Sequence, residues 1–94
     1  METRALDRQE IMDSLASRPE WRLEDSRLVR EFEFPTFREA VRFVNAVADL
    51  AEEKRHHPDM MISYRKVVLS LTTHSAGGIT ERDMELLAMI DKTV

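Results

Sequence analysis

The stretch TFREAVRFVNAVADLAEEKRHHP, residues 36–58, predicts the longest helix of the chain and the place where that helix ends. Thr36 and Glu39 have the spacing of a capping box, in which each side chain binds the backbone N–H group of the other residue. Since Pro58 cannot continue a helix, we expect a helix from about Phe37 to Lys54 and then an extended exit. Apolar residues recur at helical spacing on one face of this segment: Phe37, Ala40, Val41, Val44, Val47, Ala48 and Ala51.

The segment before this helix predicts a shorter helix and two strands. Asp7 and Glu10 have the spacing of another capping box, so a helix is expected over residues 7–17, ended by Pro19. Apolar and polar residues then alternate over residues 21–24 and again over residues 28–34, which is the pattern of half-buried strands. The two strands are expected to pair through a tight turn at residues 25 and 26.

The segment after the long helix predicts two more strands and a final helix. Residues 60–73 are rich in β-branched and aromatic side chains, and we expect two strands that turn near residues 65 and 66. Both glycines of the chain lie in the loop Ser75–Gly78, where unusual backbone angles carry no steric penalty. Thr80 and Asp83 form a third capping signature, which places a helix from about Glu81 to near the C-terminus.

The order helix, two strands, helix, two strands, helix predicts an α+β fold. Short connections favour antiparallel pairing, so we expect a four-stranded antiparallel sheet with three helices packed on one face, as one domain over residues 1–94. The last helix is apolar around much of its circumference between Met84 and Ile90. Part of that surface is expected to meet another copy of the chain, in a homodimer or a homotetramer.

Composition excludes several classes of function. The chain has 43% hydrophobic and 34% charged residues and no apolar run of membrane-spanning length, and residues 1–13 are too charged for a signal peptide, so we expect a cytoplasmic protein without a membrane partner. Because there is no cysteine, thiolate metal sites and cysteine nucleophiles are excluded. A net charge of -4 without a basic stripe predicts no direct binding of nucleic acid.

All three histidines fall in one stretch of the chain. His56 and His57 lie at the exit of the long helix, and His74 comes at the end of the last strand, just before the glycine loop. Consecutive residues of an extended segment point to opposite sides, so His56 and His57 are expected to have different roles.

These histidines belong to a set of residues that resembles the signature of the pterin-4a-carbinolamine dehydratases, a family also called dimerisation cofactor of a homeodomain transcription factor. The likeness extends to Trp21, to residues 32–37 and to the segment THSAGGIT, residues 73–80, and so covers nearly the whole chain. One departure is Arg55, where some members have an acidic residue. The matching signature residues are Glu52, His56, His57, Pro58, Tyr64, His74 and Asp83.

The resemblance implies a substrate, a tetrahydropterin with a hydroxyl group on carbon 4a, and a reaction, loss of water to give the quinonoid dihydropterin. It implies no cofactor and no metal. Imidazole suits the two proton transfers because its ordinary pKa of about 6.5 leaves both protonation states populated near neutral pH. By resemblance His57 and His74 are the acid and base, His56 is the third member of the catalytic set and orients the ring, and Glu52 supports an imidazole or binds the pterin.

Four further residues are candidates for contact with the pterin by resemblance: Pro58, Thr73, Ser75 and Asp83. Asp83 has a second interpretation, because a carboxylate at the third position of a helix also caps it. Tyr64 is expected to pack against the helices.

Two other interpretations of the sequence remain open. Three imidazoles and a water molecule can form a catalytic zinc site, although the chain has no HExxH motif. The fold could also serve as a non-catalytic module that binds a protein partner, in transcription coactivation or enzyme assembly, because fold alone does not fix function. A module of that kind has no need of three histidines and a carboxylate at this spacing.

Overall fold

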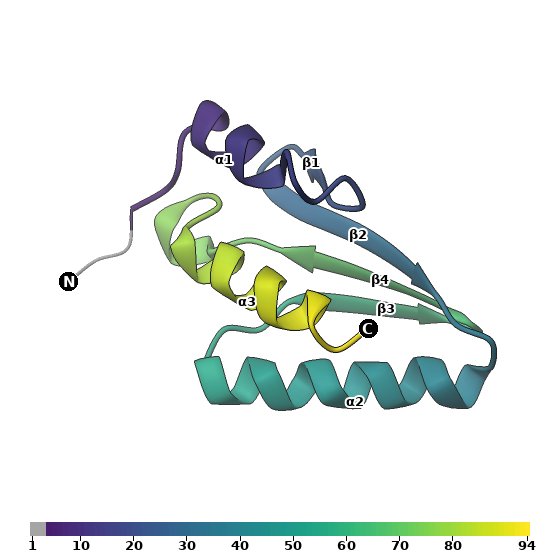
Figure 1. Ribbon diagram of the computed structural model, residues 1–94. Helices are drawn as coiled ribbons and strands as arrows, with labels where there is room; N and C mark the ends of the chain where they lie inside the picture. The colour runs from purple at the N-terminus through teal and green to yellow at the C-terminus, as the bar shows by residue number, and fades with distance from the viewer. Residues whose placement is uncertain (1–3) are drawn as a thin grey trace.

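One four-stranded sheet carries three helices on a single face (Figure 1). The computed structural model describes residues 4–94, so the first three residues of the charged N-terminal segment lie outside the described part. The strands are ordered β1-β2-β4-β3, and each neighbouring pair is antiparallel. This confirms the predicted order of elements. The elements are α1 (Arg8–Leu15), β1 (Arg22–Glu24), β2 (Arg27–Glu33), α2 (Phe37–Lys54), β3 (Asp59–Ser63), β4 (Lys66–Leu71), a 3-10 turn (His74–Ala76) and α3 (Glu81–Asp91).

The predicted caps fix where the helices begin. Asp7 and Glu10 form the expected capping box at α1, although that helix ends at Leu15, two residues before the predicted end. The Thr36 side chain accepts a hydrogen bond from the backbone of Glu39 at the start of α2. Satisfying these otherwise unpaired N–H groups stabilises a helix end by about 1 kcal/mol.

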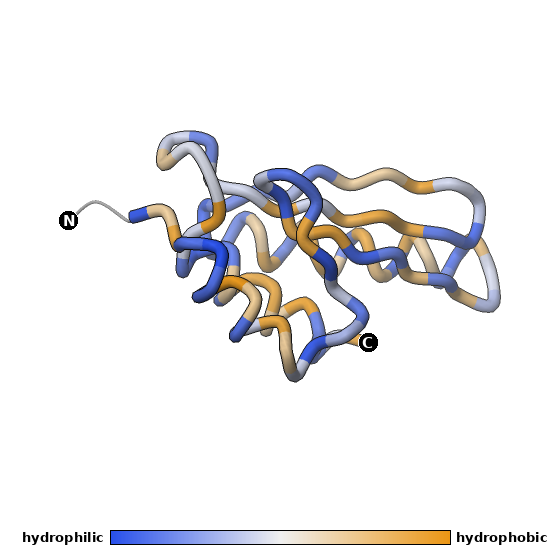
Figure 2. Tube along the Cα trace, turned by 90° about the horizontal axis from the view of Figure 1, so that it is seen from above, coloured by the Kyte–Doolittle hydropathy of each residue, from blue (hydrophilic) through white to orange (hydrophobic). Residues whose placement is uncertain are grey.

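Strand alternation explains why all three helices cover the same face. On β2 and β4 the apolar residues that face the helices are at most 4% exposed, whereas Glu31 and Glu33 face solvent on the opposite side. Hydrophobic residues therefore recur along the strands and along one side of the helices (Figure 2). Burying each large aliphatic side chain in this core contributes roughly 1.5–3 kcal/mol. The buried residues on the helix-covered face of these two strands are Leu28, Phe32, Val67, Leu69 and Leu71.

Both hairpin turns place a non-glycine residue in the left-handed region. Asp25 and Tyr64 each have a φ of 55°, which is uncommon for residues with a side chain. The β3–β4 turn contains Tyr64 and Arg65, one residue earlier than predicted. As a result Tyr64 is 70% exposed, and the expectation that it packs against the helices is wrong.

The end of α3 is tied to the first half of the chain by one carboxylate. Asp91 accepts hydrogen bonds from the Trp21 indole at 2.8 Å, from Arg18 at 2.7 Å and from Arg30 at 2.9 Å. Charge-assisted hydrogen bonds of this kind are roughly twice as strong as neutral ones. They hold α3 in a fixed position over the sheet.

The exposed apolar surface lies mainly on β3 rather than on α3. Leu86, Leu87 and Ile90 of α3 are buried in the chain's own core, which explains the apolar character of this helix without a partner. On β3, by contrast, Met61 is 65% exposed and Ile62 is 40% exposed. Within residues 4–94, no helix is both long enough and apolar enough to cross a bilayer.

Candidate functional site

The predicted site residues meet at one end of the sheet, on the left in Figure 1. Asp59 at the start of β3 pairs with Ser70 near the end of β4. The segment just before β3 contains the paired histidines, and the segment just after β4 leads to His74. These two segments therefore lie side by side. The end of α2 and the beginning of α3 close this region from the helix side.

A left-handed residue at the end of α2 directs His56 inward. Arg55 has φ 52° and ψ 41°, and its N–H group still binds the carbonyl oxygen atoms of Ala51 and Glu52. The N–H group of His56 then returns to the carbonyl of Ala51 at 3.0 Å. These bonds end the helix in the manner of a Schellman motif, a position that usually carries glycine. His56 is consequently buried, whereas Arg55 and His57 are exposed.

Asp83 and His56 form the buried centre of the region. Nε2 of His56 lies 2.5 Å from Oδ1 of Asp83, and the side chain of Asp83 is fully buried. The other carboxylate oxygen accepts the Thr73 hydroxyl at 2.7 Å and the backbone N–H group of Thr80 at 2.9 Å. Because Thr73 donates its single proton to Asp83, its oxygen must accept the Thr80 hydroxyl, which lies 2.8 Å away. Asp83 thus caps α3 and binds His56 at the same time.

Two further contacts join the end of α2 to the first turns of α3. The guanidinium group of Arg82 donates to the carbonyl oxygen of Arg55 at 2.7 Å. Nζ of Lys54 lies 2.6 Å from Oε1 of Glu85, and this hydrogen bond raises the pKa of Lys54 and lowers that of Glu85. Together with the Asp83 contact, these bonds hold the backbone that carries both histidines.

His57 faces the opposite side from His56, as strand alternation predicts. Its Nε2 atom lies 2.5 Å from Oε2 of Glu52, and both side chains are largely exposed. An ionised carboxylate can only accept a hydrogen bond, so the contact places a proton on Nε2 of His57. The Nδ1 atom is left to exchange a proton with another molecule.

His74 begins the 3-10 turn after β4 and is exposed. It lines a hollow of about 350 Å³ between the β1–β2 turn and the glycine loop. Gly77 has a φ of 73°, which confirms the expected special backbone of this loop. The loop is closed by a bridge between Thr73 and Gly78, and Thr73 donates its N–H group to the carbonyl of Gly78 at 2.9 Å.

Hydrogen bonds thus bring together two groups of the predicted site residues. His56, Thr73 and Asp83 form one buried group, and Glu52 with His57 forms one exposed pair. Pro58 is half-buried and Ser75 is exposed at the same end of the sheet. In the chain from residue 4 to residue 94, no three histidine or carboxylate side chains lie close enough together to hold a metal ion.

Sequence reasoning did not predict the contacts that Thr80 and Arg82 make in this region. The capping pattern predicts the cap at Thr80, but it does not indicate that the hydroxyl group of this residue reaches Thr73. The contact of Arg82 with the backbone of Arg55 joins residues 27 positions apart. No local sequence pattern carries that information.

Comparison with known proteins gives concordant matches over nearly the whole chain. Residues 4–93 match the family described as Pterin 4 alpha carbinolamine dehydratase. A Chloroflexus aurantiacus protein named pterin-4-alpha-carbinolamine dehydratase is 51% identical over 87 residues, which cover 93% of this chain and 94% of that protein. A Thermomicrobium roseum protein of the same name is 56% identical over 81 residues, covering 86% of this chain and 87% of the relative. The crystal structure of a transcriptional coactivator/pterin dehydratase from Brucella melitensis has a TM-score of 0.89 at 30% identity, over 94% of this chain and 96% of that one.

Proposed function

Because the chain belongs to the pterin-4a-carbinolamine dehydratase family, we propose that it removes water from a tetrahydropterin hydroxylated at carbon 4a. The product is the quinonoid dihydropterin. The observation that carries this proposal is the position of His57 and His74, two exposed imidazoles at the end of the sheet where two segments of the family signature meet. The contact of Glu52 with His57 supports it, since it orients one of these imidazoles.

The reaction needs one proton delivered and one removed. A protonated imidazole gives its proton to the hydroxyl group on carbon 4a, which leaves as water. A neutral imidazole takes the proton of the neighbouring ring nitrogen, and the electron pair forms the new carbon–nitrogen double bond. His57 and His74 supply these two groups, and after turnover they exchange a proton with solvent to return to their starting states. Nδ1 of His57 is the atom that faces the substrate, because Nε2 is bound to Glu52.

The remaining site residues divide into two roles in this proposal. Glu52 is a positioning residue that fixes the tautomer of His57. The family resemblance implies that His56 and Asp83 contact the pterin. Because both side chains are buried and bound to each other, they act in this proposal as positioning residues that do not touch the substrate. Thr73 joins them through its hydroxyl group. Pro58 and Ser75 remain candidates for direct contact with the pterin ring.

The experiment that tests this function is a rate measurement on freshly generated 4a-hydroxytetrahydropterin. The purified chain should accelerate loss of water well above the spontaneous rate, by the hundredfold or more that acid–base catalysis typically contributes. A rate equal to the spontaneous background would overturn the proposal and favour a non-catalytic module that binds a protein partner.

We also propose that copies of this chain associate through β3. Within residues 4–94 this strand lies at the edge of the sheet with one side of its backbone unpaired, and all five of its residues are exposed. Exposed apolar edge strands are templates for pairing with another strand. Pairing of two copies would extend the sheet and cover Met61 and Ile62, which are 65% and 40% exposed. A closed dimer, or a tetramer built from two dimers, is the expected result.

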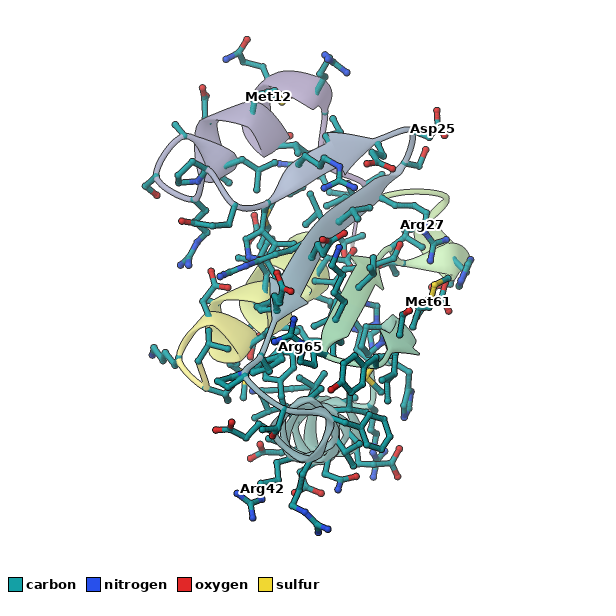
Figure 3. The ribbon with its side chains drawn as sticks, turned by 90° about the vertical axis from the view of Figure 1, so that its right-hand side faces the viewer. Met12, Asp25, Arg27, Arg42, Met61 and Arg65 are labelled. Carbon is teal, nitrogen blue, oxygen red and sulfur yellow. The ribbon has the colours of Figure 1, made fainter. Side chains whose placement is uncertain are left out.

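A single charge tests this association. Met61→Lys places an ammonium group on the edge strand and should convert the protein to a monomer in light scattering at micromolar concentration. The matched control is Met12→Lys, since Met12 is also exposed, at 43%, but lies on α1 away from β3 (Figure 3). A wild-type monomer, or an equal effect of the two variants, would contradict association through β3.

A further inference from the structure

The guanidinium group of Arg82 has no part in the proton transfers, yet it ends on the backbone beside the paired histidines. Its Nη2 atom donates to the carbonyl oxygen of Arg55 at 2.7 Å. Arg82 lies in the first turn of α3, where its own N–H group donates to the Thr80 hydroxyl at 3.2 Å. The contact therefore joins the capped start of α3 to the residue that ends α2.

The backbone conformation of Arg55 needs support of this kind. Its φ of 52° and ψ of 41° lie in the left-handed region, where a residue with a side chain is strained. A right-handed conformation at Arg55 would relieve the strain and continue α2 by one residue. Because each further helical residue turns the chain by about 100°, the segment after Arg55 would then leave the helix in a different direction.

Two hydrogen bonds favour the left-handed conformation over the continued helix. The N–H group of His56 donates to the carbonyl oxygen of Ala51 at 3.0 Å, a spacing of five residues that a regular α-helix does not contain. The bond from Arg82 is the second, since the direction of the Arg55 carbonyl group follows its backbone angles. It is of the stronger kind because the donor is charged, and a cation suits the carbonyl end of a helix. Arg82 thus selects between two conformations of Arg55.

We propose that Arg82 is a positioning residue for His57 and acts through the backbone of Arg55. This role rests on the proposed function, in which His57 is one of the two proton-transfer groups. His57 follows Arg55 by two residues, and its contact with Glu52 at 2.5 Å requires the observed direction of the chain. Without the Arg82 bond, a fraction of the molecules continues the helix through Arg55. In that fraction Glu52 no longer holds the imidazole of His57.

A second substitution distinguishes this role from direct contact of Arg82 with the substrate. Arg82→Met removes the donors and keeps the apolar stem, and it should lower the turnover number roughly 3- to 30-fold, because only molecules with a left-handed Arg55 stay competent. Adding Arg55→Gly should restore turnover to within about threefold of the wild type, since glycine adopts the left-handed region without strain. Adding Arg55→Ala should not restore it, because alanine keeps the strain.

The matched control is Arg65→Met. The guanidinium group of Arg65 binds the side chain of Glu33 at the opposite end of the sheet and touches no backbone near the histidines. Its replacement should leave the turnover number within about twofold of the wild type, as expected for an exposed ion pair.

The tautomer of His57 gives a readout that does not depend on turnover. Its contact with Glu52 places the proton of the neutral imidazole on Nε2, and nitrogen-15 NMR distinguishes this form from the one protonated on Nδ1. Arg82→Met should show both tautomers. The double variant with Arg55→Gly should return to the Nε2 form, and the double variant with Arg55→Ala should not.

Unchanged turnover and an unchanged tautomer in Arg82→Met would overturn this role of Arg82. Lost turnover that Arg55→Gly does not restore, or that Arg55→Ala restores equally well, would also overturn it. If Arg82→Met does not fold, recovery of folding with Arg55→Gly alone would support the role, and recovery with neither or with both would contradict it. Absence of turnover in the wild type would overturn the proposed function alone, because the tautomer of His57 still tests the role of Arg82.

Discussion

His56 and Asp83 are 27 residues apart in the sequence, and their side chains meet at 2.5 Å between Nε2 and Oδ1. The contact joins the exit of α2 to the first turn of α3 in the interior, where Asp83 has no exposed surface. A buried carboxylate is tolerated when its oxygen atoms are all bound, as they are here by His56, Thr73 and the backbone of Thr80. Removing Asp83 takes the carboxylate partner from the buried Nε2 of His56, and removing His56 takes the partner from Oδ1 of Asp83.

We therefore expect Asp83→Asn to destabilise the protein by about 2–4 kcal/mol, because the neutral amide loses the charge of the carboxylate and can accept hydrogen bonds through only one of its two terminal atoms. Urea unfolding measures this loss. The matched control is Glu85→Gln on the same helix, which breaks only an exposed pair with Lys54 and should change stability little. An Asp83→Asn variant as stable as Glu85→Gln would show that the buried group does not hold this region together.

Glu52→Gln should slow turnover without altering the fold. Glu52 is exposed and contacts Nε2 of His57, so its loss frees the imidazole to rotate and change tautomer. Partners that orient an imidazole typically change activity by roughly 10- to 100-fold. The turnover number should fall in that range while the Michaelis constant and the unfolding midpoint stay near their wild-type values. Glu53→Gln, the neighbouring exposed carboxylate, is the control, and equal turnover in the two variants would remove Glu52 from the mechanism.

Arg55→Gly should stabilise the protein. Arg55 occupies the left-handed region with a φ of 52°, where a side chain is strained and glycine is not. The expected gain is about 0.5–1 kcal/mol, since the greater freedom of glycine in the unfolded chain offsets part of the relief. Arg55→Ala keeps the strain and separates this effect from loss of the charge. A loss of stability in Arg55→Gly, measured by thermal unfolding, would contradict the backbone explanation.

Acid should weaken the N-terminal cap of α1. The hydrogen bond from Arg4, followed by that from the backbone of Asp7, lowers the pKa of Glu10 from 4.5 to about 2. A group whose pKa is lower in the folded state stabilises that state above the unfolded value, near pH 4.5, and this contribution is lost as the pH falls toward 2. Urea midpoints measured between these pH values should therefore fall less steeply in Glu10→Gln than in the wild type. Parallel curves would show that the cap carboxylate does not contribute.

The fold could be predicted from local signals because each signal depends on neighbours in sequence. Capping residues such as Thr36 and Thr80 lie within one turn of the groups they bind, and strand alternation has a period of two residues. The prediction failed at one of the two hairpin turns, neither of which carries a glycine that would mark its position. Tyr64 lies in the left-handed region of the β3–β4 turn, which moved the turn by one residue and exposed the side chain.

The candidate site was only partly predictable for a different physical reason. The family signature named Asp83 and His56, but the contact between them depends on how α3 packs against the end of α2. The hollow beside His74 depends likewise on the hydrogen bond from Thr72 to Ser26, which are 46 residues apart. Contacts between distant segments have no periodicity in the sequence, so they appear only when the chain is folded.

The most direct test of the proposed chemistry is the turnover number of His57→Ala and His74→Ala on 4a-hydroxytetrahydropterin, measured separately and together. Each single replacement should lower the turnover number about 100-fold or more with little change in the Michaelis constant, because each removes one proton transfer. The double replacement should lower it by less than the product of the two single effects, since both groups serve one reaction. Unchanged turnover in both single variants would contradict the assignment of His57 and His74 as the acid and base.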